Sequence, residues 1–223
     1  MPYYPIFLDI EKKTCLVVGG GAVAERKVLS LLFSGARVAV ISPQLTKKLK
    51  SLVKTGKIRH TARRYCVGDI EGAFLVVSAT DSEEINKAVS KEARKAGTLL
   101  NVVDRPELCN FIVPSVVERG SLLVAISTSG KSPYLAKALR KTLERSIPPE
   151  MAVFVELMGA VRRKLLKENA KNDKKDRIYE ALLNSPLLEW IKKGDRAAIN
   201  RFLKKTVGEE GEGYTLSKLK VKL

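Results

Sequence analysis

The sequence has few of the residues that usually build metal centres and disulfide frameworks. Among its 223 residues are one histidine, three cysteines and one tryptophan. Cys15, Cys66 and Cys109 are far apart and odd in number, which argues for reduced cytosolic thiols and against a disulfide framework or a zinc site. We therefore expect no resident metal and predict a cytoplasmic protein.

Long apolar runs are also missing. No run approaches the ~20 residues that a membrane span needs. The first residues lack the basic segment and long apolar segment that are typical of a secretory signal peptide. Because 45% of the residues are hydrophobic, we expect a globular chain that buries a real core, and no membrane partner.

Negative charge is scarce relative to positive charge. The chain has 41 basic and 24 acidic residues, a net charge of +17. Residues 151–223 contain 17 basic and 10 acidic residues, a net +7, so the excess is spread along the chain. Such a charge attracts polyanions, whether nucleic acid, an anionic membrane or a small polycarboxylate or phosphate, and a solvated basic surface is the alternative. No recognisable nucleic-acid-binding motif is present, so specific nucleic-acid binding is not expected.

A glycine-rich turn lies between the first predicted strand and the first predicted helix. The apolar, β-branched run Thr14–Val18 suits a strand buried on both faces. The pattern Gly19-x-Gly21-x-x-Ala24 then fits the dinucleotide-binding fingerprint, with alanine in the third place. Gly19 allows a tight turn, Gly21 lets a pyrophosphate approach the backbone, and Ala24 lets helix and strand pack closely. A purely structural turn is the alternative.

The second predicted strand, Arg37–Ile41, lacks the acid that usually follows it in an NAD site. That acid holds the ribose hydroxyls, whereas here the sequence continues with Ser42, Pro43 and Gln44. On physical grounds the choice between NAD and NADP therefore stays open. His60 is expected to be an ordinary residue of a strand and not a catalytic group.

Polar residues also follow the next predicted strands, at the sheet edge where ligands bind. Thr80 and Asp81 come after the run 73–78, and a cap of the following helix is the favoured role for Asp81, with Ser82 the other capping candidate. Asp104 ends the strand at 98–103. It could take a proton from a bound substrate or attract a cation, or it could be a simple turn residue.

The pattern changes after Pro106. Runs at 111–117 and 121–128 suit an antiparallel hairpin. The segment 128–133 then combines hydroxyls, a glycine and a lysine before a helix, which suits an anion-binding loop or simply a well-capped helix. From 150 onwards the spacing predicts helices, followed by an acidic linker at 208–213 and a basic tail that is either a strand or disordered. At the other end, Tyr3–Leu8 is expected to form a short edge strand or a cap.

The assembled motifs resemble the precorrin-2 dehydrogenase/sirohydrochlorin ferrochelatase family, the dehydrogenase–chelatase module of siroheme synthase. They follow the family's order and spacing over about residues 1–150. The matching pieces are 5–7 (PIF), 19–27 (GGGAVAERK), 78–81 (SATD), 101–104 (NVVD), 111–115 (FIVPS) and 126–133 (ISTSGKSP).

The resemblance implies a homodimer of α/β chains, each with a Rossmann-like parallel sheet domain, a hairpin and helix dimerisation region, and an all-helical C-terminal domain. The expected bounds are 1–112, 113–149 and 150–207, with a flexible linker and tail at 208–223. The implied activity is NAD-dependent oxidation of precorrin-2 to sirohydrochlorin, with ferrous iron insertion to give siroheme in some members. A non-enzymatic NAD-sensing or partner-binding module on the same fold is the competing hypothesis.

The resemblance also assigns site residues. Asp104 is the catalytic candidate, and the tetrapyrrole would lie against Thr128, Ser129 and Lys131. The residues expected to bind NAD are Gly19, Gly20, Gly21, Ala22, Val23, Ala24, Pro43, Gln44 and Thr80. The sequence has no His/Cys/Glu cluster that would hold iron on its own, but the macrocycle itself supplies four nitrogens.

Overall fold

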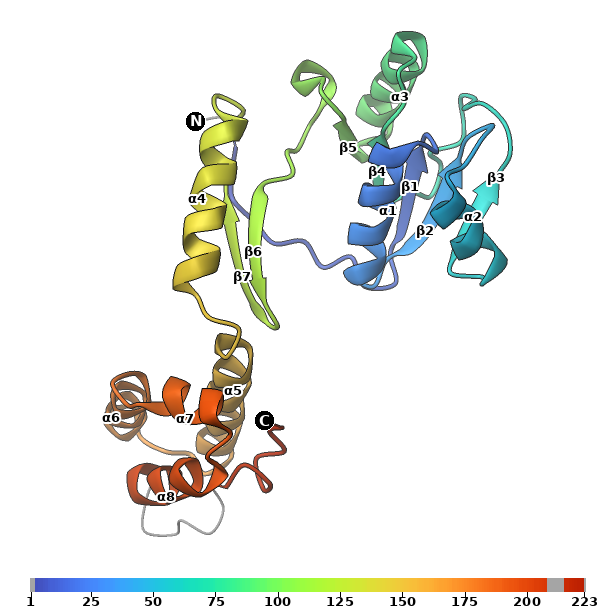
Figure 1. The fold of residues 1–223 in the computed structure, drawn as a ribbon. Helices are drawn as coiled ribbons and strands as arrows, with labels where there is room; N and C mark the ends of the chain where they lie inside the picture. Colours follow the sequence, from blue (N-terminus) through green and yellow to red (C-terminus); the bar gives the residue numbers. More distant parts are fainter. Residues whose placement is uncertain (1–2, 208–214, 223) are drawn as a thin grey trace. The chain divides into compact units, whose positions relative to one another are not determined.

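Five short parallel strands organise the first of the two units into which the chain divides, Met1–Val113 and Pro114–Leu223. The computed structural model describes residues 3–207 and 215–222. The strands are β1 (Thr14–Val18), β2 (Arg37–Ile41), β3 (Ile58–Thr61), β4 (Leu75–Ser78) and β5 (Leu99–Val102). They lie in the order β3-β2-β1-β4-β5 (Figure 1). The predicted Rossmann-like α/β class is thereby confirmed.

Helices cover both faces of this sheet. One face packs against α1 (Ala22–Phe33) and α2 (Lys47–Lys54), and the other against α3 (Glu83–Ala96). Successive strand residues such as Leu16 and Val17 point to opposite faces, and both are buried. The continuous apolar runs of the strands follow from this two-sided burial.

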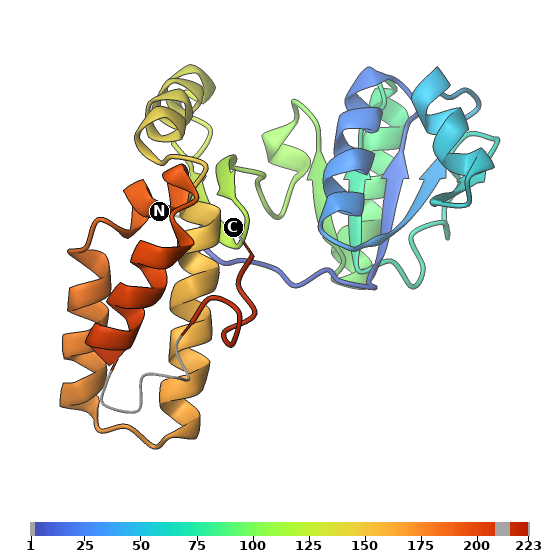
Figure 2. The same cartoon turned by 60° about the horizontal axis from the view of Figure 1, so that its bottom comes forward.

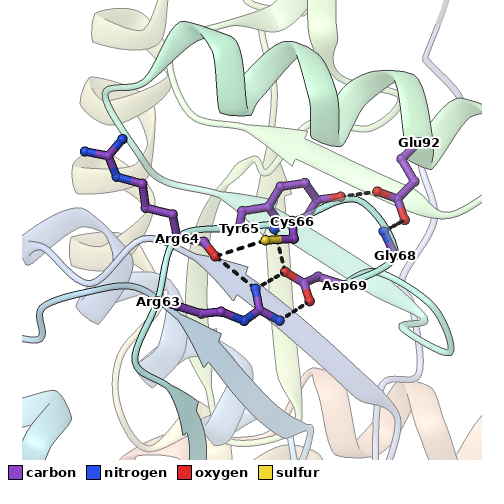
Figure 3. Close-up of polar contacts among 7 residues, drawn as sticks. All are labelled: Arg63, Arg64, Tyr65, Cys66, Gly68, Asp69 and Glu92. Carbon is purple, nitrogen blue, oxygen red and sulfur yellow. Dashed lines mark hydrogen bonds and ion pairs between the residues drawn. The ribbon is translucent and has the colours of Figure 1, made fainter.

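Carboxylates order the connection between β3 and β4 and join it to α3 (Figure 3). Asp69 accepts hydrogen bonds from Arg63 at 2.6 and 2.7 Å and from the backbone N–H of Cys66 at 2.7 Å. The Arg63 guanidinium keeps the pKa of Asp69 below its usual value. Tyr65 donates its hydroxyl to Glu92 on α3. These bonds fix a loop that supplies buried residues to the sheet face under α3.

The second unit begins with the predicted hairpin. Strands β6 (Ser115–Arg119) and β7 (Leu122–Ile126) pair antiparallel and precede α4 (Pro133–Ser146). Arg119 donates to the backbone oxygens of Glu144 and Ile147, at 2.7 and 2.9 Å, and so joins the hairpin to the end of α4. Val117 is buried, whereas Val116 and Leu123 are exposed.

Four further helices build the core of the second unit (Figure 2). They are α5 (Met151–Lys167), α6 (Asn172–Leu183), α7 (Leu187–Lys193) and α8 (Arg196–Val207). Leucines from all four helices are buried together, and the rings of Trp190 and Phe202 lie 5.6 Å apart at the cluster's margin. The helical spacing of apolar residues after 150 is explained by this core.

The two ends of the chain differ from expectation. Residues 3–10 form no strand, and Tyr4 and Phe7 are 86% and 68% exposed, so the predicted edge strand is wrong. The predicted linker at 208–213 lies outside the described residues. Residues 215–222 are turns and not a strand, and Leu216 and Leu219 are buried in the helical core. The N–H of Leu216 donates to the side chain of Asn200 at 2.9 Å, which fastens this segment to α8.

Two adjacent leucines provide a test of the helical core. Leu182 is fully buried and Leu183 is 63% exposed. Leu182→Ala should lower the free energy of unfolding by about 2–5 kcal/mol through lost burial and an unfilled cavity, whereas Leu183→Ala should change it by less than about 0.5 kcal/mol. Urea unfolding followed by Trp190 fluorescence reports on this unit directly. Equal effects of the two changes would contradict the assigned core.

Candidate dinucleotide and substrate site

Two of the three consecutive glycines after β1, Gly19 and Gly20, have no room for a side chain. Gly19 has φ +118°, and a Cβ on it would lie 2.2 Å from the backbone oxygen of Ala79. Gly20 has no room either, since its Cβ would lie 1.9 Å from the backbone oxygen of Gln44. These two positions let the turn pack against the segments that follow β4 and β2.

Gly21 differs from both, because a Cβ there would meet nothing within 4 Å. It is the N-cap of α1 and provides no side-chain hydrogen bond to the helix. The other two helices of the unit are capped, α2 by Thr46 and α3 by Ser82. The first N–H groups of α1 are therefore available to an anion, and the positive end of the helix dipole favours one.

Asp104 lies at the same edge of the sheet, because backbone hydrogen bonds continue past the strand ends. The N–H of Ala79 donates to Val18 at 2.7 Å, and that of Val103 donates to Ser78 at 2.9 Å. Gly19 follows Val18, and Asp104 follows Val103, so both residues lie just beyond these hydrogen bonds, on the two sides of β4. Asp104 is exposed and has φ +58°, which is uncommon for a residue other than glycine but accessible to Asp and Asn.

The loop that carries Asp104 folds back along β5 and is fixed there by side chains. Asn110 accepts from the N–H of Leu100 at 2.7 Å and donates to Thr98 at 2.8 Å, so its amide replaces a missing neighbouring strand. The Cys109 sulfur accepts from the N–H of Val102 at 3.1 Å and lies 3.2 Å from the oxygen of Arg105. Burial raises the pKa of this thiol, which keeps its proton for donation.

Lys27 is a candidate site residue that the sequence reasoning missed. It is half-buried on the side of α1 that also carries Ala24 and Val28, where an apolar residue would be expected. Burial and the neighbouring Arg26 lower its pKa, and the nearby charge of Asp104 opposes that shift. Lys27 has no ion pair within 4.0 Å in the described parts of the chain. Its cation lies near enough to Asp104 for the two charges to interact.

The polar residues after β4 have structural partners. Ser82, and not Asp81, caps α3: its hydroxyl accepts from the N–H of Ile85 at 3.4 Å. The capping role favoured for Asp81 was wrong, and the other candidate, Ser82, is the residue that immediately precedes the helix. Thr80 accepts from the N–H of Ser82 at 3.3 Å, and its backbone oxygen accepts from Asn86 at 3.1 Å.

Pro43 and Gln44, the residues after β2 that were predicted to bind NAD, lie beside the glycine turn. Pro43 and Gln44 are exposed, and the N–H of Thr46 donates to Gly20 at 3.0 Å. Pro43 and Gln44 also line a hollow of about 570 Å³, together with Leu45, Lys50, Val53 and His60. His60 is a strand residue as predicted, and its Nε2 lies 2.9 Å from the backbone oxygen of Ser42.

Thr128, Ser129 and Lys131 lie in the second unit, in the turn before α4. Thr128 accepts from the N–H of Ser132 through its hydroxyl and from that of Lys131 through its backbone oxygen, both at 3.0 Å. Ser132 caps the helix, because its hydroxyl accepts from the N–H of Leu135 at 3.2 Å. The turn is therefore ordered by its own residues, while Asp104 and the glycine turn belong to the first unit.

The residues at the edge of the sheet fit a dinucleotide. The turn provides open space at Gly21, uncapped helix N–H groups and, at Ala24, a fully buried small residue where α1 meets the sheet. Within residues 3–207 and 215–222, no group of three or more His, Cys, Asp or Glu is placed to hold a metal. No helix of this part is long and apolar enough to cross a bilayer. Fold and site together define a Rossmann-like dinucleotide-binding protein.

Comparisons with known proteins narrow this class. Residues 6–115 match a family model described as putative NAD(P)-binding, and residues 119–146 match the central region of sirohaem biosynthesis proteins. Siroheme synthase of Nitrosomonas europaea is 40% identical over 200 residues, which cover 89% of this chain and 42% of that protein. Siroheme synthase 1 of Aeromonas salmonicida is 38% identical over 211 residues, 94% of this chain and 45% of that protein.

A solved structure covers nearly the same length as this chain. SirC, described as a precorrin-2 dehydrogenase, superposes with a TM-score of 0.76 at 25% identity, over 92% of this chain and 98% of that one. The chain spans less than half the length of the siroheme synthases that it matches. It belongs to the siroheme synthase/precorrin-2 dehydrogenase family.

The open position at Gly21 provides a direct test of the dinucleotide site. Asp at an N-cap is favourable for a helix, so Gly21→Asp should fold with an unchanged or higher melting temperature. Its carboxylate would occupy the anion position, and we expect the dissociation constant for NAD⁺, measured by calorimetry, to rise at least about 100-fold, close to 3 kcal/mol. Ser34→Asp, at the exposed far end of α1, makes the same charge change and should leave the affinity within threefold. Unchanged NAD⁺ affinity in Gly21→Asp would exclude this site.

Proposed function

We propose that this chain catalyses the NAD-dependent oxidation of precorrin-2 to sirohydrochlorin. The observation that carries the proposal is the placement of the uncapped glycine turn and Asp104 at one edge of one sheet. The similarity to SirC over almost its full length supports the same reaction. The siroheme synthase relatives support a place for it in tetrapyrrole biosynthesis.

In this proposal the glycine turn binds and orients the cofactor. Gly21 and the first N–H groups of α1 would hold the pyrophosphate, and Gly19 and Gly20 keep the turn close to the segments after β4 and β2. Pro43, Gln44 and Thr80 flank the adenosine end. When bound, NAD⁺ accepts a hydride from a substrate carbon.

Asp104 is the proposed proton acceptor. The oxidation removes two hydrogens from precorrin-2: one leaves as a hydride to NAD⁺, and the other leaves as a proton. An exposed carboxylate held by a fixed loop can take that proton and pass it to water. The nearby charge of Asp104 raises the pKa of Lys27, against the lowering by burial and by Arg26, so a cation lies close to the proposed proton acceptor.

The substrate explains the charge of the chain. Precorrin-2 has a rim of carboxylates, and a protein of net charge +17 attracts such a ligand. Thr128, Ser129 and Lys131 are proposed to bind this rim, with Lys131 as the cation. Their ordered turn, with positive φ at Ser129 and Gly130, presents the loop in one conformation.

Ferrous iron insertion belongs to the same proposal as a further step. The described residues offer no metal-binding cluster, so iron would enter as a substrate and be held by the four nitrogens of the macrocycle. The protein's task would be to accept the two pyrrole protons that the metal displaces, and Asp104 is the candidate acceptor.

We propose that the chain forms a homodimer through the exposed face of the hairpin. A two-stranded sheet is marginally stable by itself, and only its inner face is covered, with Val117 buried. Val116 and Leu123 remain 38% and 44% exposed on the outer face. A second copy packed on this face would bury both side chains.

A substitution of Asp104 distinguishes an enzyme from a non-enzymatic NAD-sensing module on the same fold. Asn tolerates a positive φ as well as Asp does, so Asp104→Asn should fold and bind NAD⁺ normally. We expect its rate of precorrin-2 oxidation to fall about 100-fold or more, because the proton acceptor is lost. Asp81→Asn changes another exposed acid at the same edge and should retain the rate. Full turnover by Asp104→Asn would remove this residue from the mechanism.

The proposed dimer is tested by introducing charge on the hairpin. Leu123→Glu should convert a dimer to a monomer in light-scattering measurements, because a carboxylate in an apolar interface is costly. Leu166→Glu makes the same change at a residue that is 49% exposed on α5 and should remain dimeric. A wild-type monomer, or a dimeric Leu123→Glu, would contradict the assignment.

A further inference from the structure

The hollow beside the end of β2 has a composition that the proposed NAD site alone does not explain. Its volume is about 570 Å³, and it is lined by Pro43, Gln44, Leu45, Lys50, Val53 and His60. It therefore lies between the segment after β2, one side of α2 and strand β3. No carboxylate lines it.

This hollow adjoins the place where the adenosine ribose of a bound dinucleotide would lie. The segment after β2 contacts the glycine turn directly: Thr46 donates its N–H to Gly20, and the oxygen of Gln44 fills the space of a Gly20 side chain. In folds of this class the pyrophosphate lies on the first helix, and the ribose 2′ position lies at the end of the second strand. A group attached at that position would point toward the hollow.

The end of β2 carries no acid of the kind that selects a free ribose hydroxyl. Ser42 occupies the first position, but its hydroxyl is turned inward and donates to the oxygen of Gln44 at 2.7 Å. The carboxylate that contacts this segment, Glu25 on α1, accepts the hydroxyl of Thr46 at 2.5 Å and is not among the lining residues. The acid that would repel a 2′-phosphate is therefore missing.

The charge around the hollow favours an anion. Between Glu25 and Asp69 the sequence has eleven Lys and Arg residues and no Asp or Glu. Asp69 itself is paired with Arg63. Lys50 is the cation among the lining residues, and it has no ion pair in the structure as described for residues 3–207 and 215–222. The excess of positive charge in the first unit thus lies between residues 26 and 68, the stretch that also contains the residues lining the hollow.

We propose that this hollow is a subsite for a 2′-phosphate, with Lys50 as its cation, so that the chain binds NADP⁺ as well as NAD⁺. This inference rests on the dinucleotide site of the proposed function and extends it to cofactor choice. An NAD-selective site places a carboxylate at the 2′ position, and a phosphate-accepting site places a cation there. Here the carboxylate is absent and a lysine is present.

Calorimetric binding of NAD⁺, NADP⁺ and 2′,5′-ADP to the whole chain tests the subsite without any turnover. We expect NADP⁺ to bind within about tenfold of NAD⁺, a difference below 1.4 kcal/mol. Lys50→Glu should weaken NADP⁺ and 2′,5′-ADP at least tenfold and NAD⁺ less than threefold. Lys48→Glu is the matched control, because Lys48 is an exposed lysine of the same helix that does not line the hollow. It should change all three affinities less than threefold.

The outcomes separate the subsite from the dinucleotide site. If NAD⁺ binds and NADP⁺ binds over 100-fold more weakly, or if Lys50→Glu and Lys48→Glu weaken NADP⁺ equally, the subsite is wrong and the dinucleotide site stands. If neither cofactor binds the wild-type chain, the dinucleotide site fails and the subsite with it.

Discussion

The close packing of the turn after β1 against its two neighbouring segments is the constraint on which the site depends. Backbone oxygens of Ala79 and Gln44 occupy the places where side chains of Gly19 and Gly20 would be. This contact sets the ends of β1, β2 and β4 at one level and leaves the start of α1 open. A methyl group at either glycine would push apart the strands whose ends form the site. The third glycine is different, since it is the one that leaves space for a ligand.

The acid at the same edge depends on a second set of interactions. The side-chain amide of Asn110 forms hydrogen bonds with the backbone at β5, as a neighbouring strand would. The sulfur of Cys109 accepts a hydrogen bond from the backbone of the same strand. These contacts hold Asp104 in a left-handed conformation next to the ladder that leads back to Gly19. Its place at the sheet edge beside the glycine turn distinguishes this carboxylate from the other exposed acids. Lys27 adds a cation from α1, the helix whose first turn is the proposed binding site for the cofactor pyrophosphate.

The sequence predicted the fold well where burial alone determines structure. Strands β1 and β2 have the predicted bounds, because each is a β-branched run buried on both faces. The strand predicted for the apolar N-terminal residues was wrong, because hydrophobicity alone does not determine which strand of a sheet a segment would pair with. Tyr4 and Phe7 remain exposed. Leu216 and Leu219 could not be placed from the sequence, because their burial depends on the helices that they contact.

The site could be predicted only in part, for a related reason. Motif spacing located the glycine turn and Asp104, since both follow strands directly. Lys27 and Lys50 appear as ordinary basic residues of helices in the sequence, and their surroundings depend on helix rotation and on the neighbouring strand.

The most direct test is an anaerobic reaction of the purified chain with precorrin-2 and NAD⁺, in which sirohydrochlorin and NADH are quantified together. The account predicts that both form at equal amounts and at a rate far above that without protein. NAD⁺ binding without conversion of precorrin-2 would contradict the dehydrogenase and favour the NAD-sensing alternative.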